Sequence, residues 1–509
     1  MSLTHKRIKK GIVIRRASQT FFLLLFTYIL WSTTYPLKGI LPPETFFKIN
    51  PLVMLITSLS ERTALGGGIL YAVIMLIAAC IAGRFFCGWI CPLGTSIDIA
   101  HLIRKTPRTS DAVNAAVRLP KFFILAIIAL CAIAGVQVAW VLDPMAIMAR
   151  FISLNFIPGA ILLVNALFVA LIKATNFYGP LYDFYRSLTS GSLGIRVYFF
   201  AHSFSILLFF LAIVGSSLIL ARLWCRAVCP LGGMYAVCAP LSKLRRRVCA
   251  CSGCGICNAR CRMGAIREDL SYRRGECILC LDCVYDCPEH ATHFAWGSRA
   301  APAAGTAGAD NDAGGISRAQ FMSLVLASLL AAGFGSLKKI MPAPRRVIRP
   351  PASLPEDEFL NRCVRCGNCM KVCITNGLQP ALLQTGIGGL WTPHLVPEIG
   401  YCEYDCTLCG NTCPTGAIRR LSVREKRSTV LGTAVIDRAL CIPWKQEKDC
   451  IVCEEHCPVP EKAIKLFKDE LSGSPVLKPY VDTRLCVGCG ICQNKCPLRP
   501  ARAVRVTPR

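Results

Sequence analysis

Long apolar runs dominate the first half of the chain, and short polar segments separate them. A helix that crosses a hydrocarbon core of ~30 Å needs about 20 mostly apolar residues. Runs close to that length cover residues 19–36, 65–86, 121–141, 154–173 and 198–223, and a weaker run covers 319–337. The pattern predicts an α-helical multi-span membrane domain over residues 1–240.

Clusters of basic residues indicate how these runs are oriented. Lys and Arg residues are frequent before the first run, after the second and after the fifth. Since cytoplasmic loops carry an excess of positive charge, all three segments favour the cytoplasm. Five full crossings would instead place the last segment outside. We give the charges priority and expect the 154–173 run, which contains Pro158 and Gly159, to be re-entrant or interfacial, unless a span lies between 174 and 197.

The second half of the chain is organised around cysteines. Of 32 cysteines, 24 fall into six groups of four, and both groups of the first pair follow the pattern C-x-x-C-x-x-C-x-x-x-C. In a two-cluster ferredoxin, three closely spaced thiolates hold one 4Fe–4S cube, and the fourth cysteine ligates the cube of the partner motif. The expected ligand sets are Cys251, Cys254, Cys257 with Cys287; Cys277, Cys280, Cys283 with Cys261; Cys363, Cys366, Cys369 with Cys413; Cys402, Cys406, Cys409 with Cys373; Cys441, Cys450, Cys453 with Cys496; and Cys486, Cys489, Cys492 with Cys457.

This spacing predicts six 4Fe–4S clusters in α+β bacterial-type ferredoxin modules, two clusters in residues 241–297 and four in 341–509. Structural zinc is the alternative, but zinc sites usually combine two C-x-x-C pairs without a third cysteine. Some groups depart from the pattern. Cys261 and Cys373 lack the proline that follows the other fourth cysteines, Cys441 lies nine residues before Cys450, and Cys249 is a rival of Cys251.

Composition supports this division into a membrane part and a metal-binding part. Hydrophobic residues make up 53% of the 509 residues and charged residues 17%, and mean hydropathy is +0.47. These values exclude a disordered chain and are too apolar for an ordinary soluble enzyme. The formal net charge of +28 counts every cysteine as neutral. Each oxidised cluster with four thiolates carries about −2, so six clusters would lower the charge to about +16.

Two short sequences in the membrane half share the pattern C-x-x-x-C-P-L-G. They contain Cys87 and Cys91 in the first copy and Cys225 and Cys229 in the second, and each closes an apolar run. Such thiols bind a cofactor in one of three ways: as ligands of a further cluster, as ligands of a transition metal, or as redox-active thiols near a quinone. They are otherwise buried small hydrophobic residues. The spacing leaves these alternatives open.

The paired C-x-x-x-C-P motifs, followed by the ferredoxin motifs from Cys251 to Cys287, resemble the NapH-type membrane ferredoxins, whose relatives include the NosR and CcoG groups. Residues 355–500 resemble the NapG-type polyferredoxins, including the stretch from Gly389 to Pro397. The chain is therefore similar to a fusion of the two. The resemblance implies a membrane part that takes electrons from quinol, and a cluster chain that relays them to a separate reductase or cytochrome.

In this interpretation the chain is an electron-transfer subunit whose one enzymatic step is quinol oxidation. No motif for haem, flavin or NAD stands out, and the direction of electron flow stays open. The alternative is a copper-binding and copper-reducing protein, or a metalloenzyme-maturation factor, of the CcoG or NosR kind. Basic residues flank the membrane runs, so we expect membrane lipid as a partner and no nucleic acid. The resemblance implies the quinone pool and a redox protein as further partners.

Residues 298–340 are expected to join the two parts. The stretch 298–316 is a linker of small residues, and 317–340 resembles a degenerate Tat signal or a transmembrane segment, with Ser317, Arg318 and Phe321 before the apolar run. We therefore expect a multi-pass protein of the bacterial inner membrane, with the N-terminus and first ferredoxin cytoplasmic and residues 341–509 periplasmic. The alternative keeps both ferredoxin blocks in the cytoplasm.

Few other polar residues in the membrane half are candidates for chemistry. A single histidine within an apolar run cannot supply both axial ligands of a b-type haem. The histidines are packing residues or contacts of quinone, and the carboxylates at the borders of the runs are candidates for proton transfer. These minor candidates are His101, His202, Asp98, Asp143 and Asp183.

Overall fold

The computed structural model describes residues 2–35, 37, 39, 41–62, 68–103, 110–175, 179–190, 198–249, 251–297, 322, 346–469 and 475–508. The chain divides into two compact units, each assembled from several segments. The first is Met1–Ile29, Glu44–Met148 and Leu208–Met341, and the second is Leu30–Pro43, Ala149–Leu207 and Pro342–Arg509. Each unit combines apolar helices with ferredoxin motifs, so the units cut across the boundaries expected from the sequence, which stay a prediction.

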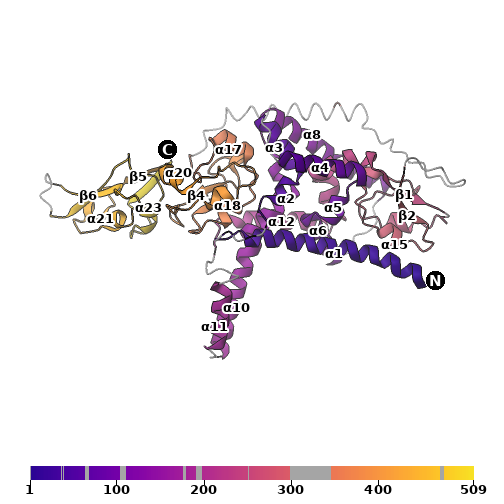
Figure 1. Ribbon diagram of the computed structural model, residues 1–509, viewed down its shortest axis with the longest axis horizontal. Coiled ribbons are helices and arrows are strands. Elements are labelled where there is room, and N and C mark those ends of the chain that lie inside the picture. Colours follow the sequence, from indigo (N-terminus) through magenta and orange to yellow (C-terminus); the bar gives the residue numbers. More distant parts are fainter. Residues whose placement is uncertain are drawn as a thin grey trace. The chain divides into compact units, whose positions relative to one another are not determined.

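Helices make up most of the first unit (Figure 1). A Pro or a side-chain cap opens several of them: Asn50 accepts a hydrogen bond from the Leu52 N–H at the start of α3. The elements of this part are α1 (Ser2–Ser32, shared with the second unit), α2 (Thr45–Lys48), α3 (Pro51–Glu61), α4 (Gly68–Ala82), α5 (Phe85–Trp89), α6 (Pro92–Ile103), α7 (Asp111–Arg118), α8 (Pro120–Ile133), η1 (Ala139–Val141), α12 (Ser203–Ser216, shared), η3 (Trp224–Val228), α13 (Pro230–Cys238) and η4 (Ala239–Leu241).

The two ends of the first ferredoxin module pair with each other as a short antiparallel sheet. Strand β1 (Leu244–Val248) precedes the cysteines, β2 (Thr292–Trp296) follows them, and the two pair antiparallel with Arg246 opposite Phe294. Between them lie only short elements, α14 (Ile256–Ala259), η5 (Arg274–Glu276) and α15 (Asp282–Tyr285). Cys257, Ile266 and Tyr272 belong to a small buried core. The loops that carry the cysteines are therefore held by one strand pair and this core.

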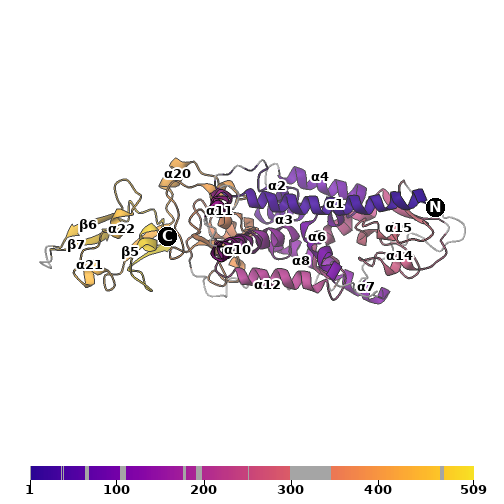
Figure 2. The ribbon, with the colours of Figure 1, turned by 90° about the horizontal axis from the view of Figure 1, so that it is seen from below.

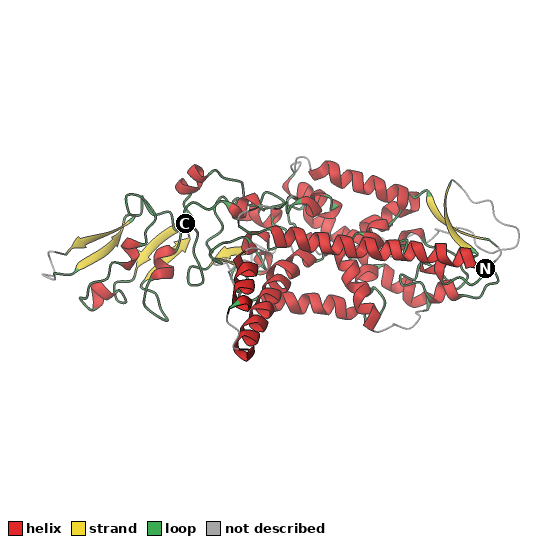
Figure 3. Cartoon of the chain, turned by 60° about the horizontal axis from the view of Figure 1, so that its bottom comes forward, coloured by secondary structure: helices red, strands yellow, loops and turns green. Residues whose placement is uncertain are grey.

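The second unit contains two further cysteine modules, and Figure 3 distinguishes its short strands from its helices by colour. An isolated antiparallel bridge joins Ser353 to Ile418 on either side of the second module, and β5 pairs with β8 around the third. The elements are α9 (Pro144–Phe151, shared), η2 (Ile152–Phe156), α10 (Ile157–Thr175), α11 (Pro180–Ser190), α17 (Glu356–Arg362), α18 (Asn368–Lys371), β3 (Leu378–Pro380), η7 (Ile387–Gly389), β4 (Pro393–Leu395), α19 (Leu408–Asn411), α20 (Val423–Ser428), β5 (Gly432–Ile436), α21 (Ile442–Lys445), α22 (Val452–Glu455), β6 (Ile464–Lys468), β7 (Leu477–Val481), α23 (Ile491–Lys495) and β8 (Val504–Pro508).

Three helical stretches among the described residues are long and apolar enough to cross a membrane. They are Lys10–Trp31, Asp111–Ile133 and Pro144–Ala174. The first belongs to α1, a single unbroken helix in Figure 2. The expected runs 65–86 and 198–223 form the shorter helices α4, with 15 residues, and α12, with 14. The described residues thus contain three candidate spans, and the multi-span membrane domain and its number of crossings stay predictions.

The run 154–173, which we expect to be re-entrant or interfacial, lies within one long helix, and its placement in the membrane stays a prediction. The helix is continuous from Pro144 to Ala174 and contains the π-helical turn η2 just before Pro158 and Gly159. Proline is tolerated here because a wider turn rearranges the hydrogen bonds that its missing N–H would break. The segment expected between 174 and 197 contains α11, a helix of 11 residues. The linker and Tat-like segment, 298–340, lie outside the described residues except Met322.

Candidate metal centres

The fold brings cysteines of neighbouring motifs together in the first module. Cys261, the fourth cysteine of its own group, lines one small apolar cavity with Cys277, Cys280 and Cys283 of the next group. Tyr272 also borders this cavity. This is the crossed arrangement in which each motif lends its last thiol to its partner.

The same crossing occurs in the other two modules. Three cavities and one thiol cluster each combine three cysteines of one motif with the fourth cysteine of the other. They are Cys402, Cys406, Cys409 with Cys373; Cys441, Cys450, Cys453 with Cys496; Cys486, Cys489, Cys492 with Cys457; and Cys363, Cys366, Cys369 with Cys413.

The remaining group is less fully defined. Cys257 lies within electrostatic range of Cys251 and Cys254. Cys287 is buried in the same module, and Cys249, the rival of Cys251, is exposed with its N–H bonded to the Ala291 carbonyl. Five of six expected quartets are therefore assembled, and the ligand assignment as a whole stays a prediction.

The regular loops share one unusual backbone conformation. Two left-handed residues, with φ between 52° and 88°, flank the second cysteine in four of the six motifs. Such residues turn successive N–H groups toward one concave site that favours anions. In two loops these N–H groups already reach sulfur: Gly253 N lies 3.4 Å from Cys251 Sγ, and Leu279 N lies 3.4 Å from Cys277 Sγ. The four pairs are Gly253 and Gly255, Leu279 and Leu281, Arg365 and Gly367, and Gly488 and Gly490.

The two irregular motifs use another turn. At the position that is left-handed elsewhere, Thr407 has φ −121° and Ile451 has φ −111°. Both motifs have extra residues before their second cysteine, as in the nine-residue step from Cys441 to Cys450. In both motifs the cysteine thus lines its cavity without a left-handed residue on either side of it.

Burial makes these thiols poor thiolates unless a metal binds them. Desolvation raises the pKa of Cys366 to about 12 and that of Cys489 to about 11. A bound metal removes that proton, because thiolate is the ligand form. Among the described residues, no three His, Cys, Asp or Glu side chains converge closely enough to hold a single ion. The donor set fits iron–sulfur cubes, which supply one-electron redox chemistry when bound.

The four membrane-half thiols also lie together. Cys87, Cys91, Cys225 and Cys229 are 5–8% exposed and lie within electrostatic range of one another. Cys87 lies on α5 and Cys225 on η3, whereas the other two directly precede α6 and α13. The structure thus brings the two motif copies together, while what the four thiols bind stays a prediction.

Two arginines that the sequence interpretation missed hold the copies together. Arg84 Nη2 donates to the Cys225 carbonyl at 3.3 Å, and Arg222 Nη1 donates to the Cys87 carbonyl at 3.1 Å. Each arginine stands three residues before the first cysteine of its own copy. The full repeat is therefore R-x-x-C-x-x-x-C-P-L-G, and the extra arginine was the available signal.

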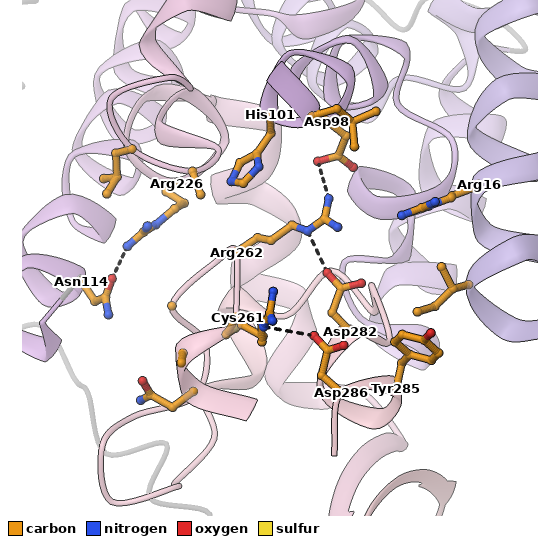
Figure 4. Close-up of a pocket in the computed structure, with 18 of the residues that line it drawn as sticks. Arg16, Asp98, His101, Asn114, Arg226, Cys261, Arg262, Asp282, Tyr285 and Asp286 are labelled. Atoms are coloured by element: carbon orange, nitrogen blue, oxygen red, sulfur yellow. Dashed lines mark hydrogen bonds and ion pairs between the residues drawn. The ribbon is translucent and has the colours of Figure 1, made fainter. Parts of the chain in front are cut away.

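A cavity of about 490 Å³ lies beside these motifs, and several of the side chains that line it are charged. Figure 4 shows Arg262 between the carboxylates of Asp98 and Asp282; the closest ion pairs measure 3.4 Å and 2.8 Å. Asp98 also binds Arg222, with 2.6 Å between Nη2 and Oδ2. His101 lines the same cavity.

The other minor candidates have structural partners. Asp143 accepts hydrogen bonds from Asn50 Nδ2 at 2.7 Å and from the Ala146 N–H at 2.8 Å. Asp183 lies exposed in the first turn of α11. His202 has φ 64° and its carbonyl accepts from Ser205. The structure thus places Asp143 in a helix cap and gives no site to the other two.

Comparison with known proteins agrees with the cysteine pattern. Two family models match, both described as a 4Fe-4S binding domain, one over residues 63–110 and 203–248 and the other over 479–499. The chain is 37% identical to the methylamine utilization ferredoxin-type protein MauM of Paracoccus denitrificans over 171 residues, which are 33% of this chain and 74% of MauM.

Two ferredoxin-type proteins of Escherichia coli are similar as well. NapG is 32% identical over 166 residues, 32% of this chain and 70% of NapG. NapF is 32% identical over 151 residues, 30% of this chain and 80% of NapF. No solved structure matches the chain.

Proposed function

The chain belongs to the family of ferredoxin-type proteins that includes MauM, NapG and NapF, and from this we propose that it relays electrons between the quinol pool and a separate reductase. Its ferredoxin-type relatives support electron transfer through 4Fe–4S clusters. The finer proposal is a chain of six clusters, with a membrane half of the NapH type that oxidises quinol.

The crossed cysteine quartets carry the proposal. In each crossed pair a motif contributes ligands to two neighbouring cubes, so both clusters are held by one continuous loop system. Cys402 also contacts the third module, since its N–H donates to the Cys489 carbonyl at 2.8 Å. This contact joins the second and third modules directly, as an electron path between adjacent clusters requires.

The proposed topology places the first ferredoxin in the cytoplasm and residues 341–509 in the periplasm. The Tat-like stretch in residues 317–340 is the sequence feature behind this proposal. Within each unit, one contact involves an end of the candidate span in α1. Near the amino end of the candidate span, Arg15 Nη2 lies 3.5 Å from Asp282 of the first ferredoxin. At the carboxyl end, Lys371 of the second module donates to the Thr33 carbonyl at 2.9 Å.

The decisive experiment measures iron, sulfide and reducibility on the full-length protein, purified anaerobically in detergent. The six ferredoxin clusters alone contribute about 24 irons and as many acid-labile sulfides, at four per cube. A reduced menaquinone analogue should bleach the visible absorption of the clusters. Four or fewer irons per protein would contradict the proposal of six clusters. Clusters that are reduced by dithionite but not by the menaquinol analogue would contradict quinol oxidation.

A matched pair of variants tests the crossing itself. Cys373→Ser should cause loss of the cluster that Cys402, Cys406 and Cys409 bind, although Cys373 belongs to the other motif by sequence. Cys131→Ser, a change at a buried cysteine of α8, should leave the iron content unchanged. If Cys373→Ser instead removes the cluster of Cys363, Cys366 and Cys369, the crossed assignment is wrong.

A further inference from the structure

We propose that the cavity of about 490 Å³ in the first unit binds the ring of quinol next to the first ferredoxin, with His101 as the side chain that takes a proton from it. The inference rests on the proposed function, because it assigns a site to the quinol oxidation proposed above. Small-molecule sites are usually cavities of roughly 300–1,000 Å³ that combine apolar walls with a few polar groups. This cavity has both kinds of wall.

The apolar wall of the cavity comes from the membrane half of the chain. Val13 stands near the amino end of the candidate span Lys10–Trp31 and is 62% exposed, and Leu102 of α6 is 73% exposed. Exposed apolar side chains at the rim of a cavity suit a ligand that carries a hydrocarbon tail. The apolar lining residues on this side are Ile12, Val13, Leu102, Leu220 and Ala221.

The charges around the cavity favour a neutral ring over an anion. Four arginines and three aspartates line it, so their charges nearly balance. Arg262 lies between Asp98 and Asp282, and Arg260 Nε lies 3.7 Å from Asp286 Oδ2. An anionic headgroup would meet three carboxylates here, whereas a quinol brings hydroxyl groups and no charge.

His101 is the side chain best placed to accept a proton from a bound quinol. It stands one turn from Asp98 on α6, and both residues line the cavity (Figure 4). The carboxylate of Asp98 accepts hydrogen bonds from Gln19 and from two nitrogens of Arg222. A carboxylate that is held by this many donors is a weak base. An imidazole is the usual general base in such a place.

A single cysteine lies between this cavity and a predicted cluster site. Cys261 lines the larger cavity, and it also lines the small apolar cavity that it shares with Cys277, Cys280 and Cys283. A ring in the larger cavity would therefore lie next to a thiolate ligand of the neighbouring cluster site. This proximity gives electrons a path into the first ferredoxin without an intervening carrier.

The proposed step balances with these groups. Oxidation breaks the two O–H bonds of the quinol and releases two electrons and two protons. His101 accepts one proton at its imidazole and passes it to water, and the other proton leaves to water directly. Because a cube accepts one electron at a time, the first electron moves on to the second cluster site of the module before the other follows.

The test is the rate at which a menaquinol analogue reduces full-length protein in detergent, kept anaerobic. Ala259→Trp fills the cavity from an exposed position, and Ala112→Trp places the same ring at an exposed position of α7 outside it. We expect Ala259→Trp to abolish reduction by the analogue and Ala112→Trp to match the wild type. His101→Leu should slow reduction about 100-fold, as loss of a general base does. Iron content and reduction by dithionite should be unchanged in all three variants.

A second measurement uses the wild type alone, so it does not depend on the folding of a variant. A photoactivated azido-menaquinone probe should label peptides from α6 or from residues 256–264, and unlabelled menaquinone should suppress this labelling. Labelling only elsewhere would overturn the proposal. Labelling that is suppressed by added anionic phospholipid and not by menaquinone would identify a lipid-headgroup site and would overturn it as well.

Failure of this site and failure of the relay give different results. If the analogue reduces the wild type and Ala259→Trp equally fast at equal iron content, the quinol site lies elsewhere and the relay still stands. If the analogue does not reduce the wild type at all, quinol oxidation is contradicted, and this site with it.

Discussion

His394 illustrates how one buried side chain makes stability depend on pH. It lies on β4 opposite Gln379 of β3 and is 9% exposed. Burial, and next the positive charge of Arg349, lower its pKa to about 4. The unfolded chain, with an ordinary His pKa near 6.5, binds more protons between these values. Stability is therefore full above about pH 6.5 and falls as pH drops toward 4.

We predict that His394→Gln weakens this pH dependence. Between pH 7 and pH 5.5 the free energy of unfolding of the wild type should fall by about 1 kcal/mol because of this histidine, and the variant should not show this decrease. The measurement is the thermal midpoint for loss of the cluster absorption at both pH values. Acid lability of the clusters themselves affects both proteins, so only the difference counts. If the thermal midpoints of the two proteins shift equally between the two pH values, His394 takes up a proton in the folded protein as readily as in the unfolded chain, which would contradict the prediction.

At the scale of elements, the repeated cluster-binding loop is the smallest unit with a function. Its cysteine spacing is visible in the sequence, but the left-handed residues are not: three of the four pairs include a glycine, whereas one uses Leu279 and Leu281. A bulky residue in this conformation is strained and persists only where the surroundings hold it. Leu279 is itself buried, and its carbonyl accepts a hydrogen bond from Trp89 Nε1, which helps to hold this loop.

Two glycines at the same loop position should respond differently to alanine. Gly488 has φ 69°, and an added Cβ would lie 2.4 Å from the Gly432 backbone at the start of β5. Gly253 has φ 78° and no neighbour within 4 Å. We predict that Gly488→Ala loses about four irons with the cluster of Cys486, Cys489 and Cys492. Gly253→Ala should retain all iron and lose only about 1–2 kcal/mol from left-handed strain.

Iron quantitation and thermal stability of the two alanine variants decide this point. Equal iron in both variants would mean that β5 can move away from the loop without releasing the cluster. Equal loss in both would mean that the left-handed conformation itself, and not the close approach of β5, is what each cluster requires.

At the scale of the whole molecule, the arrangement of the chain across a membrane is the main open prediction. The amino end of α1 contacts the first ferredoxin, and Lys371 of the second module binds carbonyls just after the end of the candidate span Lys10–Trp31. A continuous apolar helix of 22 residues is long enough to cross the hydrocarbon core. Opposite sides of the membrane for the two ferredoxin blocks stay our prediction.

Protease treatment of intact spheroplasts tests this arrangement. We predict that an epitope after Arg509 is removed, whereas an epitope before Met1 stays protected until the membrane is lysed. The two tags on one chain control for leakage, because lysis exposes both. A C-terminal tag that remains protected would place residues 341–509 in the cytoplasm and leave the cluster chain on one side.

The sequence by itself determined the features that depend on local spacing. The six cysteine groups and the duplicated C-x-x-x-C-P-L-G motif are visible in the sequence, because a cube needs thiols at short, regular intervals. The crossed ligand assignment follows from the same spacing and stays a prediction. Apolar run length likewise predicted candidate spans. It overestimated α4 and α12, because hydropathy does not show where a helix ends.

Only the tertiary structure decided which distant segments share a site. Arg84 and Arg222 are separated by most of the membrane half, and their exchange of carbonyl partners depends on how α5 and η3 pack. The same holds for Glu276, a ferredoxin residue that neutralises a membrane-half arginine. A buried charge is costly unless an opposite charge lies next to it, and that partner can come from a distant part of the chain. Local sequence patterns therefore do not predict which residue it is.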